Sequence, residues 1–162
     1  MFRRVHCSTL AAALALLGAL ATTPAFAGDV KVYPGSGCQP IFEIYEDSGA
    51  TTRLTRFNGA LRNVGSKTDG IDCPIVRDRE ATTKGFTATV RVKHTSGRLN
   101  VAIHSRDAFG KFVDVAAGSI TDPGEQELTL LVEQSVPEGM YTLGLNLPVN
   151  AEIVSYTIDE LP

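Results

Sequence analysis

The sequence contains no tryptophan, three cysteines and three histidines, and each shortage narrows the range of functions. A zinc site needs about three or four close ligands, and no C-x-x-C pair is present. A serine hydrolase of the common type needs a G-x-S-x-G context, which is also absent. We therefore predict no catalytic residues, no metal site and no cofactor, and we expect the protein not to be an enzyme.

Clusters of basic residues are also missing. Lys and Arg are scattered singly apart from Arg77 and Arg79, which alternate with Asp78 and Glu80 in a way typical of a solvated strand exit. Binding to nucleic acid or to an anionic membrane normally requires clustered positive charge. The composition therefore argues against a nucleic-acid partner.

The first 27 residues have the features of an export signal. Arg3 and Arg4 precede an apolar run at 10–20, and Ala25-Phe26-Ala27 has the small-x-small form of a cleavage site. The run is shorter than the roughly 20 residues of a transmembrane helix. We predict cleavage before Gly28, no membrane insertion afterwards, and one exported domain at 28–162, in the periplasm or the extracellular medium.

Cleavage leaves two cysteines, Cys38 and Cys73, in an oxidising compartment where such a pair normally closes. The predicted disulfide closes a loop of 35 residue steps. In the chain-entropy model such a loop contributes about 3–4 kcal/mol of stability. A redox-active or metal-binding pair would need a different spacing or additional ligands.

Apolar and polar residues alternate with a period of two beyond residue 70, as in half-buried strands. No stretch after residue 28 keeps a 3.6-residue period with helix caps. We predict an all-β fold, an antiparallel β-sandwich of jelly-roll or Ig-like type, with the topology left open. The residues expected to face inward are Ile71, Cys73, Ile75, Phe86, Ala88, Val90, Val92, Leu99, Val101, Ile103, Val113, Val115, Leu128, Leu130, Val132, Leu143, Leu145, Leu147, Val154, Tyr156 and Ile158.

Three turn signals suggest hairpins, at Ser96-Gly97, at 107–110 and at 137–139. Each hairpin brings two apolar sets onto one face. The predicted facing pairs are Val92 with Val101, Val90 with Ile103, Ile103 with Val113, Val101 with Val115, Val132 with Leu143, Leu130 with Leu145, and Leu128 with Leu147.

The two histidines left after cleavage are expected on opposite faces of one sheet. In the predicted register His94 points inward opposite Leu99, and His104 points outward near Thr89. Imidazoles on opposite faces cannot share a metal ion. We therefore expect neither histidine to be essential for the protein's activity.

Four carboxylates, Asp69, Asp72, Asp78 and Glu80, surround the second cysteine. Calcium takes roughly six to eight oxygens from flexible loops, so a calcium site at one end of the sandwich is an open alternative. The D-x-D-x-D-G spacing of a calcium loop is absent. The simpler interpretation is a turn at Asp69 followed by the solvated strand exit.

Phe109 and Phe112 flank the turn at 107–110. We predict that they cover the end of the sandwich, and a small exposed contact patch is the alternative.

Several short motifs together resemble a group of small secreted bacterial proteins of unknown function. The pattern PGSxC…CPIVRD occurs here as Pro34-Gly35-Ser36-Gly37-Cys38 and Cys73-Pro74-Ile75-Val76-Arg77-Asp78, and 105–110, 147–148 and 155–160 resemble later landmarks. Members of that group often carry a second cysteine pair on two later strands. The corresponding positions here are Val101 and Leu145, which predicts that apolar packing replaces that bond. The resemblance implies a secreted β-domain and supplies no activity.

These observations predict a non-catalytic interaction or structural module that acts through loops or a sheet edge, with a protein or an envelope component as partner. The alternative is a small-ligand or glycan-binding domain. A missing aromatic platform counts against that alternative, and a concave pocket with converging polar groups would favour it. A hydrolase with a scattered carboxylate site is the third hypothesis.

Overall fold

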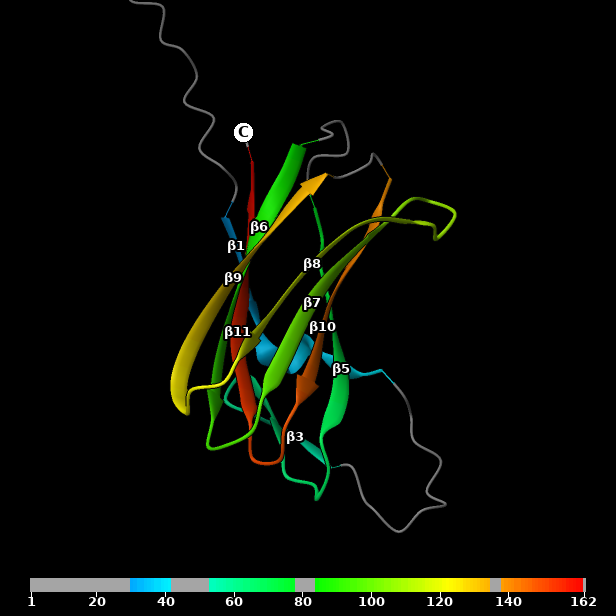
Figure 1. Cartoon of the computed structure of the whole chain (residues 1–162). Helices are drawn as coiled ribbons and strands as arrows, with labels where there is room; N and C mark the ends of the chain where they lie inside the picture. Colours follow the sequence, from blue (N-terminus) through cyan, green and yellow to red (C-terminus); the bar gives the residue numbers. More distant parts are fainter. Residues whose placement is uncertain (1–29, 42–52, 78–83, 135–137, 162) are drawn as a thin grey trace, which may run out of the picture.

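The computed structural model describes residues 30–41, 53–77, 84–134 and 138–161. These residues form two antiparallel sheets packed face to face (Figure 1), which confirms the predicted β-sandwich with one disulfide. The elements are β1 (Val30–Pro34), a 3-10 turn η1 (Gly35–Gly37), β2 (Gln39–Pro40), β3 (Leu54–Phe57), β4 (Ala60–Asn63), β5 (Asp69–Pro74), β6 (Lys84–His94), β7 (Leu99–Arg106), β8 (Phe112–Ile120), β9 (Gly124–Gln134), β10 (Met140–Leu147) and β11 (Glu152–Glu160).

The first sheet has the strand order β3-β4-β11-β6-β9, and β1 also pairs with β11. The second sheet has the order β2-β5-β10-β7-β8. No helix in the described part of the chain is long and apolar enough to cross a bilayer. The proposed signal at 1–27 lies outside the described residues, so its cleavage stays a prediction.

The predicted inward phase of most strands is confirmed. Alternate residues of β5, β6, β7 and β10 are buried between the sheets, because successive side chains of a strand point to opposite faces. The largest fully buried side chains include Tyr156, Phe86, Ile71, Ile103 and Leu143.

All seven predicted facing pairs are wrong, and one of the three predicted hairpins forms. β6 pairs with β11 and β9, and β7 pairs with β10 and β8, so the turn at Ser96-Gly97 carries the chain from one sheet to the other. β9 of the first sheet is likewise followed by β10 of the second, so the hairpin predicted at 137–139 is wrong too. In a sandwich both sheets bury one face in the same core, so alternation fixes the buried face without fixing the neighbour.

β7 and β8 do form a hairpin, but three residues out of the predicted register. Ile103 faces Ala116, and a bulge between the Ser105 and Arg106 pairings adds one residue to β8. An odd shift turns a strand over, which leaves Val115 exposed on the outer face. A second register shift, between Ile153 and Ser155 in β11, makes the predicted core residue Val154 exposed.

The predicted disulfide between Cys38 and Cys73 is present, with a Cα–Cα distance of 4.1 Å. Cys73 lies in β5, and Cys38 lies between η1 and β2. Because β1 pairs with β11 of the first sheet, the bond ties the chain that follows β1 to the second sheet.

A candidate ligand-binding face on the second sheet

The outer faces of the two sheets differ in how their polar side chains are used. On the first sheet many of them pair with one another across neighbouring strands, so their charges and hydroxyls are already satisfied. The pairs are Arg91 with Glu127 at 2.9 Å, Lys93 with Glu125 at 3.2 Å, and the hydroxyls of Thr89 and Thr129 at 2.9 Å.

On the second sheet, polar groups converge above a glycine. Gly144 of β10 lies between Asp72 of β5 and Ala102 of β7. A Cβ placed on Gly144 would lie 3.7 Å from Asp72 Oδ1 and 3.9 Å from His104 Nε2. Because Gly144 has no side chain, the carboxylate and the imidazole border one open space.

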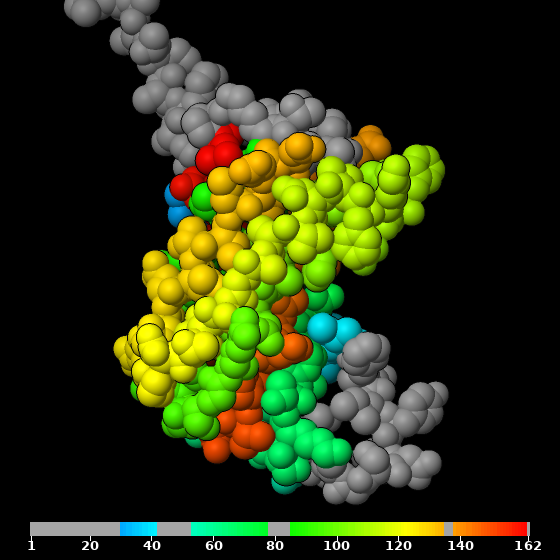
Figure 2. All heavy atoms as spheres, in the orientation of Figure 1, coloured from blue at the N-terminus to red at the C-terminus, as the bar shows by residue number. Residues whose placement is uncertain are grey.

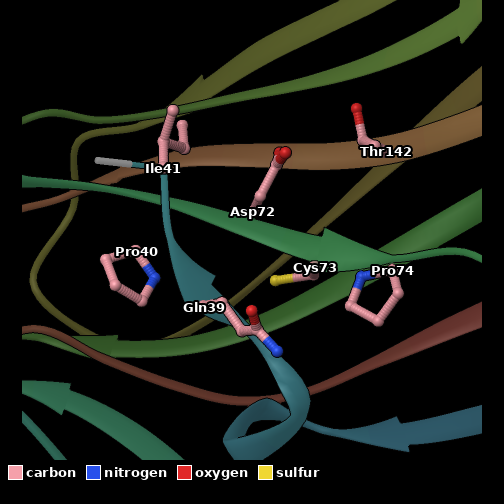
Figure 3. A pocket seen from close by; sticks show the side chains of 7 residues that line it. All are labelled: Gln39, Pro40, Ile41, Asp72, Cys73, Pro74 and Thr142. Carbon is pink, nitrogen blue, oxygen red and sulfur yellow. The ribbon is translucent and has the colours of Figure 1, made fainter. Parts of the chain in front are cut away.

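This space continues into a surface hollow of about 320 Å³ (Figure 3), lined by Gln39, Pro40, Ile41, Asp72, Cys73, Pro74 and Thr142. The Asp72 side chain rises from β5 between Ile41 and Thr142. In Figure 2 the cyan segment at 39–41 and the yellow-green turn at 107–111 stand out on the same side of the molecule, and the surface between them is recessed. The face therefore has raised borders at both sides.

Asp72 is the charged centre of this face. Partial burial raises the pKa of its carboxyl, and the nearby His104 and Arg106 partly offset that rise. Among the described residues no hydrogen bond to the Asp72 carboxylate is formed, although His104 and Arg106 are near enough to interact through their charge. The carboxylate is therefore available to a ligand.

His104 lies on the outer face, as predicted, and opposite Thr142 and Val115 instead of near Thr89. Its ring meets Phe112 edge to face, with centroids 5.6 Å apart. In the described part of the chain its Nδ1 is buried without a hydrogen-bond partner, while Nε2 points toward the space above Gly144. The sequence argument gave His104 no role, whereas the structure places it at the face.

His94 points inward and is 2% exposed, as predicted, but it lies opposite Gly124 of β9 and not opposite Leu99. The two histidines are on different sheets. They do not meet at a common site.

The turn between β7 and β8 forms the upper border of the face. Phe109 is 97% exposed and Phe112 is 52% exposed, so the prediction that they cover the end of the sandwich is wrong. Arg106 holds this border together: its guanidinium lies 3.7 Å from the Phe112 ring centroid and donates to the Gly110 carbonyl at 2.9 Å.

Of the four acidic residues that suggested calcium, the two that the structure describes are not brought together. Asp69 is buried and Asp72 points outward, because the two are separated by three positions in β5. Burial raises the pKa of Asp69 as well. Asp78 and Glu80 lie outside the described residues. Within the described ranges, no three His, Cys, Asp or Glu side chains are placed to hold a metal ion.

Sequence reasoning missed Thr142 and Gly144 altogether. Alternation could place Asp72 and His104 on outer faces, but their proximity depends on β10 lying between β5 and β7. That order joins strands far apart in the sequence, and no local signal reports it.

No protein-family model and no curated protein matches the chain. Among solved structures, BiXyn10A CBM1 in its apo form aligns with a TM-score of 0.53 at 16% identity, over 82% of this chain and 97% of that chain. The CBM22-1–GH10 modules of Clostridium thermocellum xylanase 10B with xylohexaose align with a TM-score of 0.53 at 14% identity. That match covers 85% of this chain and only 27% of the xylanase chain. At such identities the likeness shows a shared sandwich fold alone.

Proposed function

We propose that the chain is an exported, non-catalytic binding domain that holds a glycan on the outer face of its second sheet. The observation that carries this proposal is the convergence of the Asp72 carboxylate and His104 Nε2 above Gly144, beside the hollow that Thr142 lines. A concave site with a few convergent polar groups is the common form of a small-ligand site.

Sugars match the chemistry of this face. Their hydroxyls both donate and accept hydrogen bonds, and Asp72, His104 and Thr142 offer acceptors and donors of the matching kinds. Ile41 and Phe112 supply exposed apolar surface for the C–H faces of a sugar ring. The negative charge of Asp72 lies near the positive charge of Arg106, which favours a ligand without net charge.

The neighbouring carboxylates support binding without catalysis, because they already accept hydrogen bonds from the protein backbone. A glycosidase needs two carboxyl groups on either side of the scissile bond. Asp107 accepts from the backbone N–H groups of Phe109 and Lys111 in its own turn. Asp114 accepts from the backbone of Glu133 and Gln134 in β9. Both carboxylates are therefore engaged in holding the fold.

The fold likeness adds support of a general kind. The two structures compared above are described by name as a CBM1 and as CBM22-1–GH10 modules complexed with xylohexaose. A carbohydrate-binding role would fit an extracellular or periplasmic location, and it would make an envelope or environmental glycan the partner instead of a protein.

Protein binding through a sheet edge is the second candidate. β1 pairs only with β11 among the described strands, and its Val30 and Val32 side chains are exposed. A strand with one free edge can pair with an extended segment of another protein.

Titration calorimetry of the exported chain against soluble xylan, mannan and β-glucan tests the proposal. We expect binding to at least one of them, weakened about tenfold or more by Asp72→Asn, which keeps the shape and removes the charge. Glu127→Gln, on the opposite sheet, is the matched control and leaves the affinity unchanged. Absence of binding to every glycan, together with a protein partner lost on Val32→Lys, would favour the second candidate.

A further inference from the structure

The outer face of the second sheet carries a row of small side chains that crosses the strands. Asp72 of β5 faces Gly144 of β10, Gly144 faces Ala102 of β7, and Ala102 faces Ala117 of β8. Beyond Asp72, three consecutive strands thus contribute a glycine or an alanine at the same level. The neighbouring rows carry larger side chains, and from this register we expect the row to form the floor of a groove perpendicular to the strands.

The two banks of this groove are also register rows. One bank has Thr142, His104 and Val115, which face each other on β10, β7 and β8. The other bank has Asn146, Asn100 and Ser119 on the same three strands. Asn100 and Asn146 are exposed, and Ser119 is partly exposed. Hydrogen-bonding side chains therefore line both sides of the floor.

The groove reaches the margin of the sheet. β8 is the last strand of the second sheet, so Ala117 lies at its edge and is exposed. The hollow at β2, β5 and β10 lies at the opposite end of the same row. The course from β2 to β8 crosses four strand spacings, which together span about 19 Å.

On the basis of the proposed function, we infer that the ligand is an internal stretch of a linear, uncharged glycan, about four sugar units long, lying across the strands along this floor. One unit of a pyranose chain is about as long as one strand spacing of roughly 5 Å. A terminal sugar alone would occupy the hollow and leave the floor over Ala102 and Ala117 empty. The row of small residues serves a ligand that continues past Gly144 to the β8 margin.

The test uses the exported chain and xylo- and manno-oligosaccharides of one to six units in titration calorimetry. We expect the affinity to rise with length up to about four units and then level off. Ala117→Leu raises the floor at an exposed edge position, where it does not disturb the core. It should weaken binding of the hexasaccharide about tenfold and leave binding of the disaccharide unchanged.

Thr129→Leu, which adds similar bulk on the outer face of the first sheet, is the matched control and should change neither affinity. A monosaccharide or disaccharide bound as tightly as the hexasaccharide would overturn the inference and leave the proposed function intact. Equal loss of short and long ligands in Ala117→Leu would also overturn it. No binding at any length, nor to the polysaccharides, would overturn the inference and the proposed function together.

Discussion

At the scale of single residues, the structure explains Arg77 of the CPIVRD string, whose role the alternation of apolar and polar residues did not define. Arg77 is not on a solvated strand exit, because its side chain is only 7% exposed and pairs with Glu160 at 3.4 Å. The guanidinium also lies beside the paired rings of Phe86 and Tyr141, 5.4 and 5.3 Å from their centroids. Arg77 therefore fastens the chain after β5 to the end of β11.

Arg77→Met tests this contact. Glu160 is 2% exposed, and the substitution removes the positive charge that lies 3.4 Å from its buried carboxylate. We expect the free energy of unfolding to fall by about 3 kcal/mol. Urea denaturation measures it, and Arg77→Met combined with Glu160→Gln should recover part of the loss because no charge remains buried. Equal losses in the single and double variants would contradict the ion-pair argument.

We expect the protein to lose stability at high pH because of the buried hydroxyl of Tyr156. Burial, with a smaller contribution from the nearby Tyr33, raises the pKa of its hydroxyl to about 12, and the hydroxyl donates to the Pro74 carbonyl at 2.7 Å. In the unfolded chain the same group ionises near about pH 10. The hydroxyl of Tyr156 therefore keeps its proton to a higher pH in the folded state than in the unfolded state. The stability that this difference contributes is fully present below about pH 10 and is lost as the pH rises toward 12.

Chemical denaturation at pH values from 8 to about 11.5 measures this loss. Tyr156→Phe should be less stable at neutral pH by about 1 kcal/mol, because the hydrogen bond is gone. The same variant should lose less stability than the unmodified chain above about pH 10. Identical alkaline slopes for the two proteins would exclude Tyr156 as the cause.

At the scale of strands, the sequence predicts which side chains are buried better than it predicts which strands are neighbours. The alternation of Phe86 to Val92 and of Leu99 to Ile103 correctly assigns their inner faces, because the side-chain period of a strand is local. The pairing of Val92 with Val101 is wrong because a short turn can join two strands of one sheet or carry the chain to the other. The candidate face depends on this non-local order, and so it was not predictable.

The pairing of β7 with β10 leads to a prediction at the scale of strands. Val101 and Leu145, which replace the second cysteine pair expected from the resemblance, face each other directly and are buried. Facing Cβ atoms lie about 4.5–5.5 Å apart, which a disulfide can bridge with a small adjustment. We expect Val101→Cys with Leu145→Cys to oxidise on export. Mass spectrometry should show four hydrogens lost for two bonds.

The matched control moves one cysteine by one inward position. Val101→Cys with Leu143→Cys places the thiols diagonally, because Leu143 faces Ile103. Diagonal neighbours lie about 7–8 Å apart at Cα, which is too far for an unstrained bond. Free thiols in the first variant, or a bond in the control, would contradict the register of β7 and β10. Either result would also contradict the assignment of Val101 and Leu145 to the second cysteine pair of the group that the chain resembles.

At the scale of the whole molecule, the two sheets divide their tasks. The first sheet satisfies much of its outer polarity internally through cross-strand pairs such as Arg91 with Glu127. The second sheet keeps Asp72 and His104 available above a floor of small residues. The single disulfide lies at the border of that second face, since Cys73 lines the hollow and Cys38 precedes its wall at 39–41.

The disulfide should therefore support both the fold and the ligand site. Cys38→Ser with Cys73→Ser opens a loop of 35 residue steps and should lower the free energy of unfolding by about 3–4 kcal/mol. β2 has only two residues paired with β5, so the wall at 39–41 should loosen more than the remaining strands do. We expect glycan affinity to fall at temperatures where circular dichroism still shows the folded sheet. Unchanged glycan affinity with reduced stability would mean that the disulfide stabilises the fold and does not support the ligand site. Two free thiols in the unreduced exported protein would exclude the disulfide itself.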